Sequence, residues 1–305
     1  MSGKDSLTRR PDGSIWYRET LHEAEGFATE YRVSEVLFDS ATPHQRLIVV
    51  DTDCFGRLVA LDGATQVTMG DEFVYHEMMA HVPLLAHGQA EDVLIIGGGD
   101  GGLAEEVLKH RSVRRLVMVE IDPGVIDFAQ AHLADLNHGC FDDPRLELVI
   151  SDGKDYAARA AERFDLIIVD STDPVGPGEV LFTRPFYADC RRLMKPRGIL
   201  VTQNGVPFLQ PAELENTMAN FAQLFTDAGC YLAVVPSYAG GFMALGWGSD
   251  DPGNREVSLE VLEARFAAAD LQTRYYTPAV HKAAFALPAF IGAIVEKGKR
   301  AGRVG

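Results

Sequence analysis

The sequence predicts an α/β protein with a mainly parallel sheet, preceded by a small antiparallel β-domain. From Asp92 onward, β-rich apolar runs alternate with helix-prone segments, which is typical of a parallel sheet with helices on both faces. The first run breaks into GGGDGG (97–102), a tight strand-to-helix turn that suits a ligand site. The chain before Asp71 instead carries short alternating segments. We therefore expect a β-domain over 13–70 and a Rossmann-like catalytic domain of methyltransferase type over 71–305.

Each element has its own signal. RLIVVD from Arg46 and RLVALDG from Arg57, separated by the turn-like DTDCFG, predict paired antiparallel strands. Apolar residues at helical spacing, with acidic residues in the first turn, predict a helix over 71–87. The sheet strands are expected at DVLII, LVMVE, LELVI, FDLIIVD and GILVTQ. YLAVVPSY and FMALGWGS flank Ala239-Gly240-Gly241 and predict a hairpin, followed by a helix-prone tail with breaks at Pro278 and Pro288.

Composition excludes some classes of protein. The chain has 305 residues, 47% of them hydrophobic, and a formal net charge of −16 without a lysine or arginine cluster, so nucleic acid and anionic membranes are poor partners. Its four cysteines form no CxxC pair, and the polar N-terminus lacks the apolar core of a signal peptide. We expect a cytoplasmic protein.

Acidic residues follow the predicted strands. Ligands of open parallel sheets bind beyond the carboxyl ends of the strands, so these side chains should share one crevice. Carboxylates gathered there repel one another unless cations bind. The residues are Asp100, Glu120, Asp122, Asp152, Asp170 and Asp173. Asp122 and Asp155 are expected to be helix caps or turn residues.

Two features indicate the kind of ligand. Glu120 lies twenty residues beyond Asp100, a distance that suits a carboxylate on ribose hydroxyls. Asp100 stands where a phosphate-binding loop would receive an anion, which favours a nucleoside with a positively charged tail. Asp170 and Asp173, in DSTDPVGPGE, could divide a diamine, one taking a proton from the reacting amine and the other pairing with the distal ammonium. A free alkyl amine has a pKa of about 10.4 and needs such a base.

Two other chemistries are disfavoured. A zincin-type metal site needs histidines four residues apart, whereas His76 and His81 in YHEMMAH are five apart. A helix residue without a metal is the simpler interpretation of His76. No GxSxG elbow supports a serine nucleophile.

The ordered motifs from Trp16 to Phe290 resemble those of bacterial spermidine synthases, the polyamine aminopropyltransferases. They are HQRLIVV, FGRLVALDG, DEFVYHEM, VLIIGGGDGG, MVEID, DGKDY, DSTDPVGPGEVLFT, QNG, PSYAGG and RYYTPAVHKAAFALP. The resemblance implies transfer of an aminopropyl group from decarboxylated S-adenosylmethionine to putrescine, giving spermidine and methylthioadenosine. It also implies that no metal or redox cofactor is needed and that the chain forms a homodimer or homotetramer.

The resemblance assigns roles to the matching residues. The methylthioadenosine part of the donor would contact Gln45, Glu120, Asp152, Gly153 and Pro177, beside the glycines Gly97, Gly98, Gly99 and Gly101. Asp100 would bind the aminopropyl amine, and Asp170 would be the base. The putrescine channel would be lined by Tyr75, His76, Asp173 and Tyr238.

Two positions depart from the family pattern. In the helix after the glycine turn, Glu105-Glu106 stands where Arg-Glu is usual. Before the YHEM helix, Met69-Gly70-Asp71-Glu72 replaces Glu-Arg-Asp-Glu, and this second change bears on the expected acceptor length and assembly. Transfer to cadaverine, agmatine or spermidine remains an alternative, as do an ordinary methyltransferase and a non-catalytic polyamine-binding protein.

Overall fold

A computed structural model describes residues 6–41, 45–174 and 176–304, which form two compact units. Unit 1 contains the chain up to Glu72 together with Val235–Gly241. Unit 2 contains Phe73–Val234 and the chain from Phe242 onward.

Unit 1 is a six-stranded antiparallel sheet in which the strands follow chain order. The strands are β1 (Leu7–Arg9), β2 (Ile15–Arg18), β3 (Glu30–Ala41), β4 (Arg46–Thr52), β5 (Gly56–Leu61) and β6 (Ala64–Thr68), with a 3-10 turn η1 (Glu23–Glu25). The antiparallel pairing predicted from RLIVVD and RLVALDG is confirmed by β4 and β5. Their apolar side chains pack around Tyr17, which is fully buried. The β4–β5 turn is closed by Thr52, whose hydroxyl donates to the Gly56 carbonyl at 2.8 Å and accepts from the Phe55 amide at 3.1 Å.

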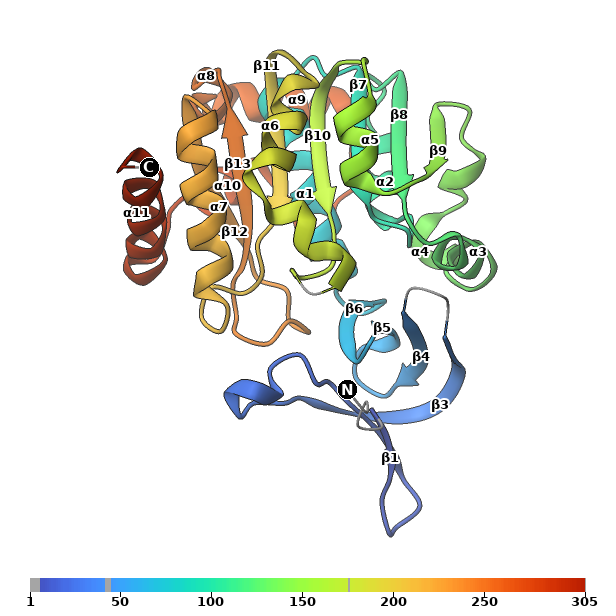
Figure 1. The fold of residues 1–305 in the computed structure, drawn as a ribbon. Helices are drawn as coiled ribbons and strands as arrows, with labels where there is room; N and C mark the ends of the chain where they lie inside the picture. The colour runs from blue at the N-terminus through green and yellow to red at the C-terminus, as the bar shows by residue number, and fades with distance from the viewer. Residues whose placement is uncertain (1–5, 42–44, 175, 305) are drawn as a thin grey trace. The chain divides into compact units, whose positions relative to one another are not determined.

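Unit 2 has a seven-stranded sheet in the order β12-β13-β11-β10-β7-β8-β9, in which β13 runs antiparallel to its neighbours (Figure 1). The strands are β7 (Asp92–Gly97), β8 (Arg115–Glu120), β9 (Leu146–Ile150), β10 (Phe164–Asp170), β11 (Met194–Gln203), β12 (Asp227–Ala233) and β13 (Met243–Ser249). All predicted strands and the terminal hairpin are confirmed. The chain passes from β7 to β8 and β9 on one side and then returns to β10 on the other, so the switch point lies between β7 and β10.

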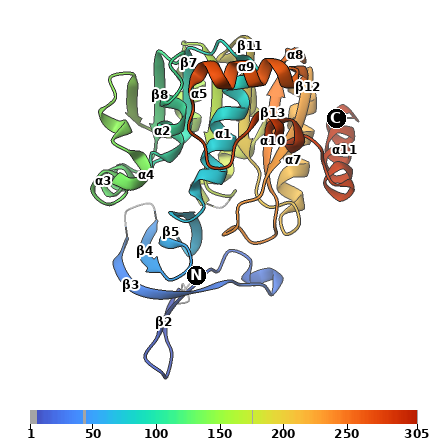
Figure 2. The same cartoon turned by 180° about the vertical axis from the view of Figure 1, so that it is seen from behind.

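Helices cover both faces of this sheet. Figure 1 shows α5, α6 and α7 on the near face, and Figure 2 shows α1, α2 and α9 on the other. The helices and turns are α1 (Glu72–His87), α2 (Gly102–Leu108), α3 (Pro123–His132), α4 (Ala134–Asn137), η2 (Cys140–Asp142), α5 (Gly153–Arg159), η3 (Gly176–Phe182), α6 (Arg184–Arg192), α7 (Pro211–Leu224), α8 (Gly253–Glu256), α9 (Leu259–Ala269), α10 (Pro278–Ala284) and α11 (Ala289–Val304). The breaks predicted at Pro278 and Pro288 are confirmed.

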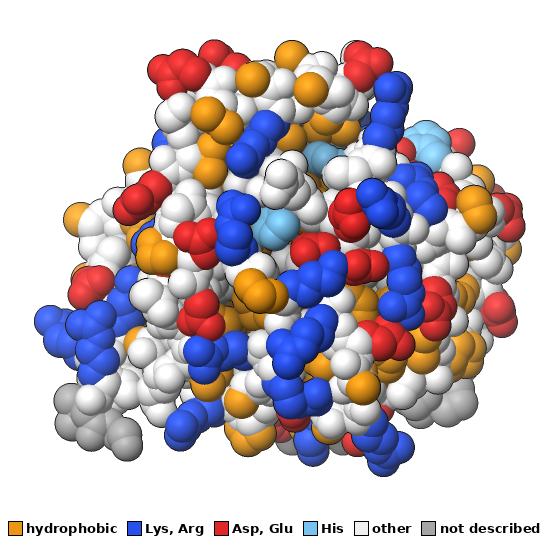
Figure 3. Space-filling model, turned by 90° about the horizontal axis from the view of Figure 1, so that it is seen from above, with side chains coloured by type: hydrophobic (Ala, Val, Ile, Leu, Met, Phe, Trp, Pro, Cys, Tyr) orange, Lys and Arg blue, Asp and Glu red, His pale blue; other side chains and the backbone are white. Residues whose placement is uncertain are grey.

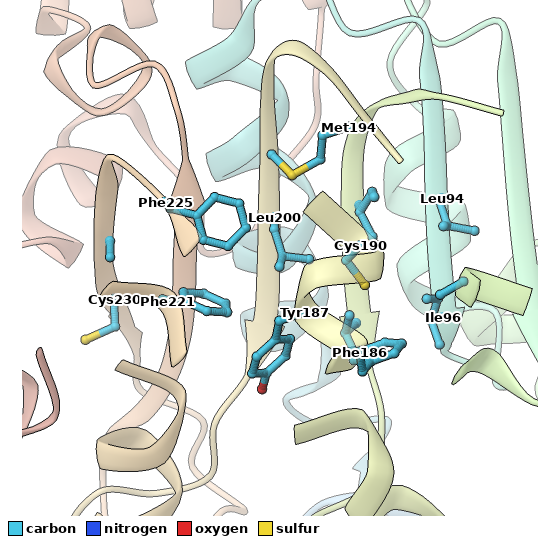
Figure 4. Packing of buried hydrophobic residues seen from close by; sticks show 14 of the residues in the cluster. Leu94, Ile96, Phe186, Tyr187, Cys190, Met194, Leu200, Phe221, Phe225 and Cys230 are labelled. Carbon is cyan, nitrogen blue, oxygen red and sulfur yellow. The ribbon is translucent and has the colours of Figure 1, made fainter. Parts of the chain in front are cut away.

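The main core lies between the sheet and helices α6 and α7. Figure 4 shows side chains of β7, β11, α6 and α7 in this layer, among them Leu94, Ile96, Leu200, Phe186, Tyr187 and Phe221. Burial of one such side chain contributes about 1.5–3 kcal/mol. This packing fixes the strand ends that carry the acidic residues.

Helix α1 is buried on nearly all sides rather than amphipathic. Its polar residues His76, Glu77 and His81 are each at most 2% exposed. Glu77 accepts the amide N–H groups of Arg274, Tyr275 and Tyr276 at 2.6–2.9 Å, so a buried charge is hydrogen-bonded.

Among the described residues, no single helix combines the length and apolar character needed to cross a membrane. The bent pair Pro278–Ala284 and Ala289–Arg303, with 61° between its helices, meets that criterion of length and composition only when the two are taken together.

Basic and acidic side chains are interspersed on the face of the molecule shown in Figure 3. A cavity of about 470 Å³ beside the α6–β11 turn is lined by several cations, including Arg191, Lys195 and Arg197. Arg191 pairs with Asp250 at 2.9 Å, Lys195 with Asp165 at 2.9 Å and Arg197 with Asp251 at 2.8 Å. These surface cations are compensated locally, and exposed pairs of this kind contribute little to stability.

Candidate active site

The glycine turn brings the end of β7 against the end of β10. Gly97 is paired in register with Asp170 and has a φ of 89°, in the left-handed region that favours glycine. A Cβ at Gly97 would lie 2.0 Å from the Asp170 carbonyl oxygen, and one at Gly102 would lie 2.4 Å from Cε1 of His76. The glycines are therefore required by close approach of β10 and α1 to the turn.

Asp170 occupies the floor of this switch point at the end of β10. Its Oδ1 accepts a hydrogen bond from the Tyr75 hydroxyl at 2.7 Å. Burial, followed by the nearby Asp100 carboxylate, raises the pKa of Asp170 to about 6. At neutral pH the carboxylate is thus mostly ionised, with a pKa closer to neutrality than that of an ordinary aspartate. Those properties suit a group that takes a proton from an amine.

Asp100 is oriented by the loop that contains it. Its Oδ1 accepts the Gly102 amide at 2.8 Å, and its Oδ2 lies 3.8 Å from Nε2 of His76. The rings of Tyr75 and His76, on α1, pack edge to face with centroids 5.6 Å apart. The structure therefore brings together Tyr75, His76, Asp100 and Asp170 in unit 2.

Glu120 lies at the end of the neighbouring strand β8. Its Oε1 accepts the Asp122 amide at 2.9 Å, while a Cβ at Gly99 would be only 2.9 Å from its Oε2. Burial raises the pKa of Glu120 to about 7. Asp122 accepts the Gly124 amide at 2.9 Å and caps α3, which confirms the cap predicted there.

Asp152 follows β9 and caps α5. Its Oδ1 accepts the amides of Lys154 and Asp155 at 2.8 and 3.2 Å. Gly153 closely approaches β7, since a Cβ there would lie 2.4 Å from Cγ2 of Ile96. Asp155 pairs with Arg159 in the exposed first turn, as expected for a helix-end residue.

Asp173 lies in the loop after β10, close enough to Glu213 of α7 to affect that carboxyl group. Burial and then the Asp173 charge raise the pKa of Glu213 to about 8, while the Gln210 amide donates to Glu213 Oε1 at 2.9 Å. Sequence reasoning missed Glu213 because it was applied to residues directly after a strand, and a loop separates Glu213 from the end of β11 at Gln203. An acidic residue in the first turn of the helix after β11 was the available signal.

Two of the assigned donor or acceptor residues belong to unit 1, and the side chain of a third lies outside the described part of the chain. Gln45 and Tyr238 belong to unit 1, where the Tyr238 hydroxyl donates to the Gln66 carbonyl at 2.6 Å. Pro177 lies in η3, and its side chain falls outside the described part of the chain. Their roles remain predictions.

The segment considered for a zincin-type metal site contacts other side chains instead. His81 Nδ1 lies 2.9 Å from Nε2 of His110, and His81 Nε2 lies 3.1 Å from Glu106. Glu106 and Glu105, at the position that departs from the family pattern, contact Lys109 at 2.8 and 2.9 Å. Within the described ranges, no three His, Cys, Asp or Glu side chains are grouped so as to hold a metal ion.

Unit 2 thus has a Rossmann-like sheet with one carboxylate in its glycine turn and a second carboxylate opposite, at the end of β10. Comparison with known proteins gives the family. The spermine/spermidine synthase domain matches residues 72–258, and the spermidine synthase tetramerisation domain matches residues 15–69. The chain belongs to the spermine/spermidine synthase family and is a polyamine aminopropyltransferase; the tetramerisation-domain match supports a homo-oligomer.

Comparison with individual relatives supports the same family. Polyamine aminopropyltransferases from Ruegeria sp. (strain TM1040) and Escherichia fergusonii are 58% and 50% identical over 91% and 90% of this chain, and the matches cover 97% and 95% of those proteins. A crystal structure of spermidine synthase in complex with the transition state analogue AdoDATO superposes with a TM-score of 0.88 at 33% identity, covering 96% of this chain and 98% of that one. Spermidine synthase from Thermotoga maritima gives 0.85 at 32% identity, covering 96% and 97%.

Proposed function

We propose that this enzyme transfers the aminopropyl group of decarboxylated S-adenosylmethionine to putrescine, giving spermidine and methylthioadenosine. The observation that carries the proposal is the pair Asp100 and Asp170 at the switch point, where a cationic donor and an amine would meet. A spermidine synthase that is 33% identical to this chain has been solved in complex with the transition state analogue AdoDATO, which supports an aminopropyl-transfer site.

For the donor, we assign Glu120 to the ribose, Asp152 to the region of the adenine, and Asp100 to the terminal ammonium. Gln45, Gly153 and Pro177 complete the methylthioadenosine contacts. Intact S-adenosylmethionine would bring its own carboxylate toward Asp100 and be repelled, so the same residue selects the donor and disfavours methyl transfer.

For the transfer, the acceptor nitrogen attacks the propyl carbon next to the sulfonium. The new C–N bond forms as the C–S bond breaks, and the electron pair of that bond leaves with neutral methylthioadenosine. Asp170, held by Tyr75, takes the proton from the amine. Asp173 pairs with the distal ammonium, and His76 and Tyr238 line the channel. A substitution with a neutral leaving group requires no redox step or Lewis acid, so we propose that no metal or redox cofactor participates.

Product analysis tests the assignment directly. Purified enzyme is given decarboxylated donor that carries an isotope label in its aminopropyl group, together with an equimolar mixture of putrescine, cadaverine, agmatine and spermidine, and the labelled products are identified by mass spectrometry. Labelled spermidine should dominate. A different aminopropylated amine would correct the acceptor, methylated amines formed from S-adenosylmethionine would indicate a methyltransferase, and the absence of any transfer would leave a polyamine-binding protein.

We further propose a cytoplasmic homodimer or homotetramer, with domains over 13–70 and 71–305.

We expect Asp100→Ala to weaken binding of decarboxylated S-adenosylmethionine more than binding of methylthioadenosine. Only the donor carries the terminal ammonium, and a charge-assisted contact contributes about 1.5–3 kcal/mol. Calorimetry with both ligands measures the difference. Asp100→Asn is the matched control, because its amide oxygen can keep the Gly102 contact while the charge is lost, and it should show the same selective effect. Equal losses for both ligands would show that Asp100 only shapes the loop.

We expect the rate at subsaturating concentrations of both substrates to fall as the pH is lowered through about 6. Asp170 has a raised pKa of about 6, so below that pH it is protonated and cannot accept the amine proton. Activity should continue to rise above neutrality as the reacting amine loses its proton more readily. A pH profile at subsaturating concentrations of both substrates measures both effects, because that rate reports the ionisation of the free enzyme and the free amine. A profile that stays level across the acid range would contradict the assignment of Asp170 as base.

A further inference from the structure

The connection between the last two strands of the catalytic sheet belongs to the other unit. Strand β12 ends at Ala233 and β13 begins at Met243, both inside unit 2. The intervening segment Val235–Gly241 nevertheless makes its contacts within unit 1. This segment carries Tyr238, which the proposed function places beside the acceptor amine.

A buried carboxylate ties the segment to the N-terminal sheet. Asp71, which is 3% exposed, accepts the Ser237 amide at 2.6 Å and the Ser237 hydroxyl at 3.1 Å. It also accepts the hydroxyl of Thr68, the last residue of β6, at 2.5 Å. We call Asp71, Thr68 and Ser237 the Asp71 clamp. Three hydrogen bonds to one buried carboxylate hold Ser237 and Thr68 in fixed positions relative to Asp71.

Two tyrosines extend the attachment. The Tyr31 hydroxyl, on β3, donates to the Ser237 carbonyl at 3.1 Å, and burial raises the pKa of Tyr31 to about 12, so it remains a donor. The Tyr238 hydroxyl donates to the Gln66 carbonyl on β6 at 2.6 Å. Both the backbone before Tyr238 and its side chain are therefore held by unit 1.

A turn hydrogen bond from the Tyr238 amide to the Val235 carbonyl, at 3.1 Å, orders the first part of the segment, and glycines form its end. Tyr238 is followed by Ala239, Gly240 and Gly241, and the two glycines have φ values of 110° and 93°. A Cβ built at Gly241 would meet no atom within 4 Å, so packing does not restrain that residue. Because glycine loses more conformational freedom on ordering than any other residue, an external attachment is needed to keep Tyr238 in one position.

We propose that Asp71 is a positioning residue for the acceptor, acting through Tyr238 of the same unit. The inference rests on the proposed role of Tyr238. It gives Asp71 a function that neither the oligomeric assembly nor the chemistry of Asp170 accounts for.

The test compares Asp71→Ala with a conservative variant and a matched control. We expect Asp71→Ala to raise KM for putrescine by about ten-fold or more, through loss of buried hydrogen bonds, while donor affinity stays within about two-fold of the parent value. Asp71→Asn should restore a nearly normal KM, because its amide oxygen can accept from Ser237 N and its amide nitrogen can donate to the two hydroxyls. Ser14→Ala removes two hydrogen bonds of the β1–β2 hairpin in the same sheet, to Asp12 at 2.6 Å and from the Trp16 indole at 3.0 Å, and should leave KM unchanged.

Two further measurements separate positioning from general damage. Hydrogen exchange should accelerate in Val235–Gly241 of Asp71→Ala, with the size of the oligomer unchanged by gel filtration. Adding Asp71→Ala to Tyr238→Ala should raise KM no further, because a residue that acts only through Tyr238 has nothing left to position.

The outcomes are distinguishable. Unchanged exchange in Val235–Gly241 would overturn the clamp itself, whereas faster exchange with an unchanged KM would overturn its link to the acceptor. Additive effects of the two substitutions, a parallel loss of donor affinity, or dissociation of the oligomer would also overturn it in favour of a structural role. If the parent enzyme transfers no aminopropyl group to any amine, the proposed function fails first and this inference fails with it.

Discussion

Asp170→Asn is expected to lower kcat by about two to four orders of magnitude while donor affinity is retained. The amide has nearly the shape of the carboxylate and can still meet the Tyr75 hydroxyl, but it cannot accept the proton of the attacking amine. Single-turnover rates at saturating putrescine, together with calorimetry of donor binding, measure the two quantities separately.

Thermal unfolding provides the control for this variant. The folded-state pKa of Asp170 is raised above its ordinary value, so its contribution to stability is present at low pH and is lost as the pH rises through about 6. Removing the charge should therefore leave Tm near pH 8 at or above that of the parent protein. Turnover within a few-fold of normal in a folded variant would remove Asp170 from the role of base.

The fold was accessible from the sequence because its signals are local. Each strand of the catalytic sheet is a short apolar run, and the run of glycines after β7 marks the turn, although the close approach of Asp170 that requires Gly97 is seen only in the structure. Carboxylates directly after strands, such as Asp100 and Asp170, were also predictable, because parallel strands end at one edge of a sheet.

The remaining features depend on contacts between distant parts of the chain. The acidic group beside Asp173 is Glu213, which reaches it from a helix after an intervening loop. Asp71 is the first residue of the helix predicted over 71–87, yet its partner Ser237 is 166 residues away. Neither contact leaves a periodic or compositional signal. The buried environment of α1, which includes the polar residues His76, Glu77 and His81, is likewise decided by tertiary packing rather than by the helix pattern.

Putrescine is expected to exceed butylamine in kcat/KM by about thirty-fold or more. The two amines present the same reacting nitrogen, but butylamine lacks the distal ammonium that Asp173 is proposed to bind. Leaving one member of such a charge pair without its partner costs about 2–5 kcal/mol, and the lower end applies because Asp173 retains partial exposure. The structure is consistent with a cation at this position. Burial and the charge of Asp173 raise the pKa of Glu213 to about 8, and a cation bound beside the two groups would lower that pKa again. Diaminopropane, whose nitrogens are closer together, should fall between the two.

Steady-state kinetics with the three amines at constant donor concentration measure the ratios, and Asp173→Asn is the matched variant. That substitution should lower kcat/KM for putrescine but change the value for butylamine far less, so that the two amines converge. Butylamine and putrescine reacting equally well with the parent enzyme would contradict the model of two carboxylates dividing one diamine. In that case Asp173 would be a turn residue of the DSTDP loop.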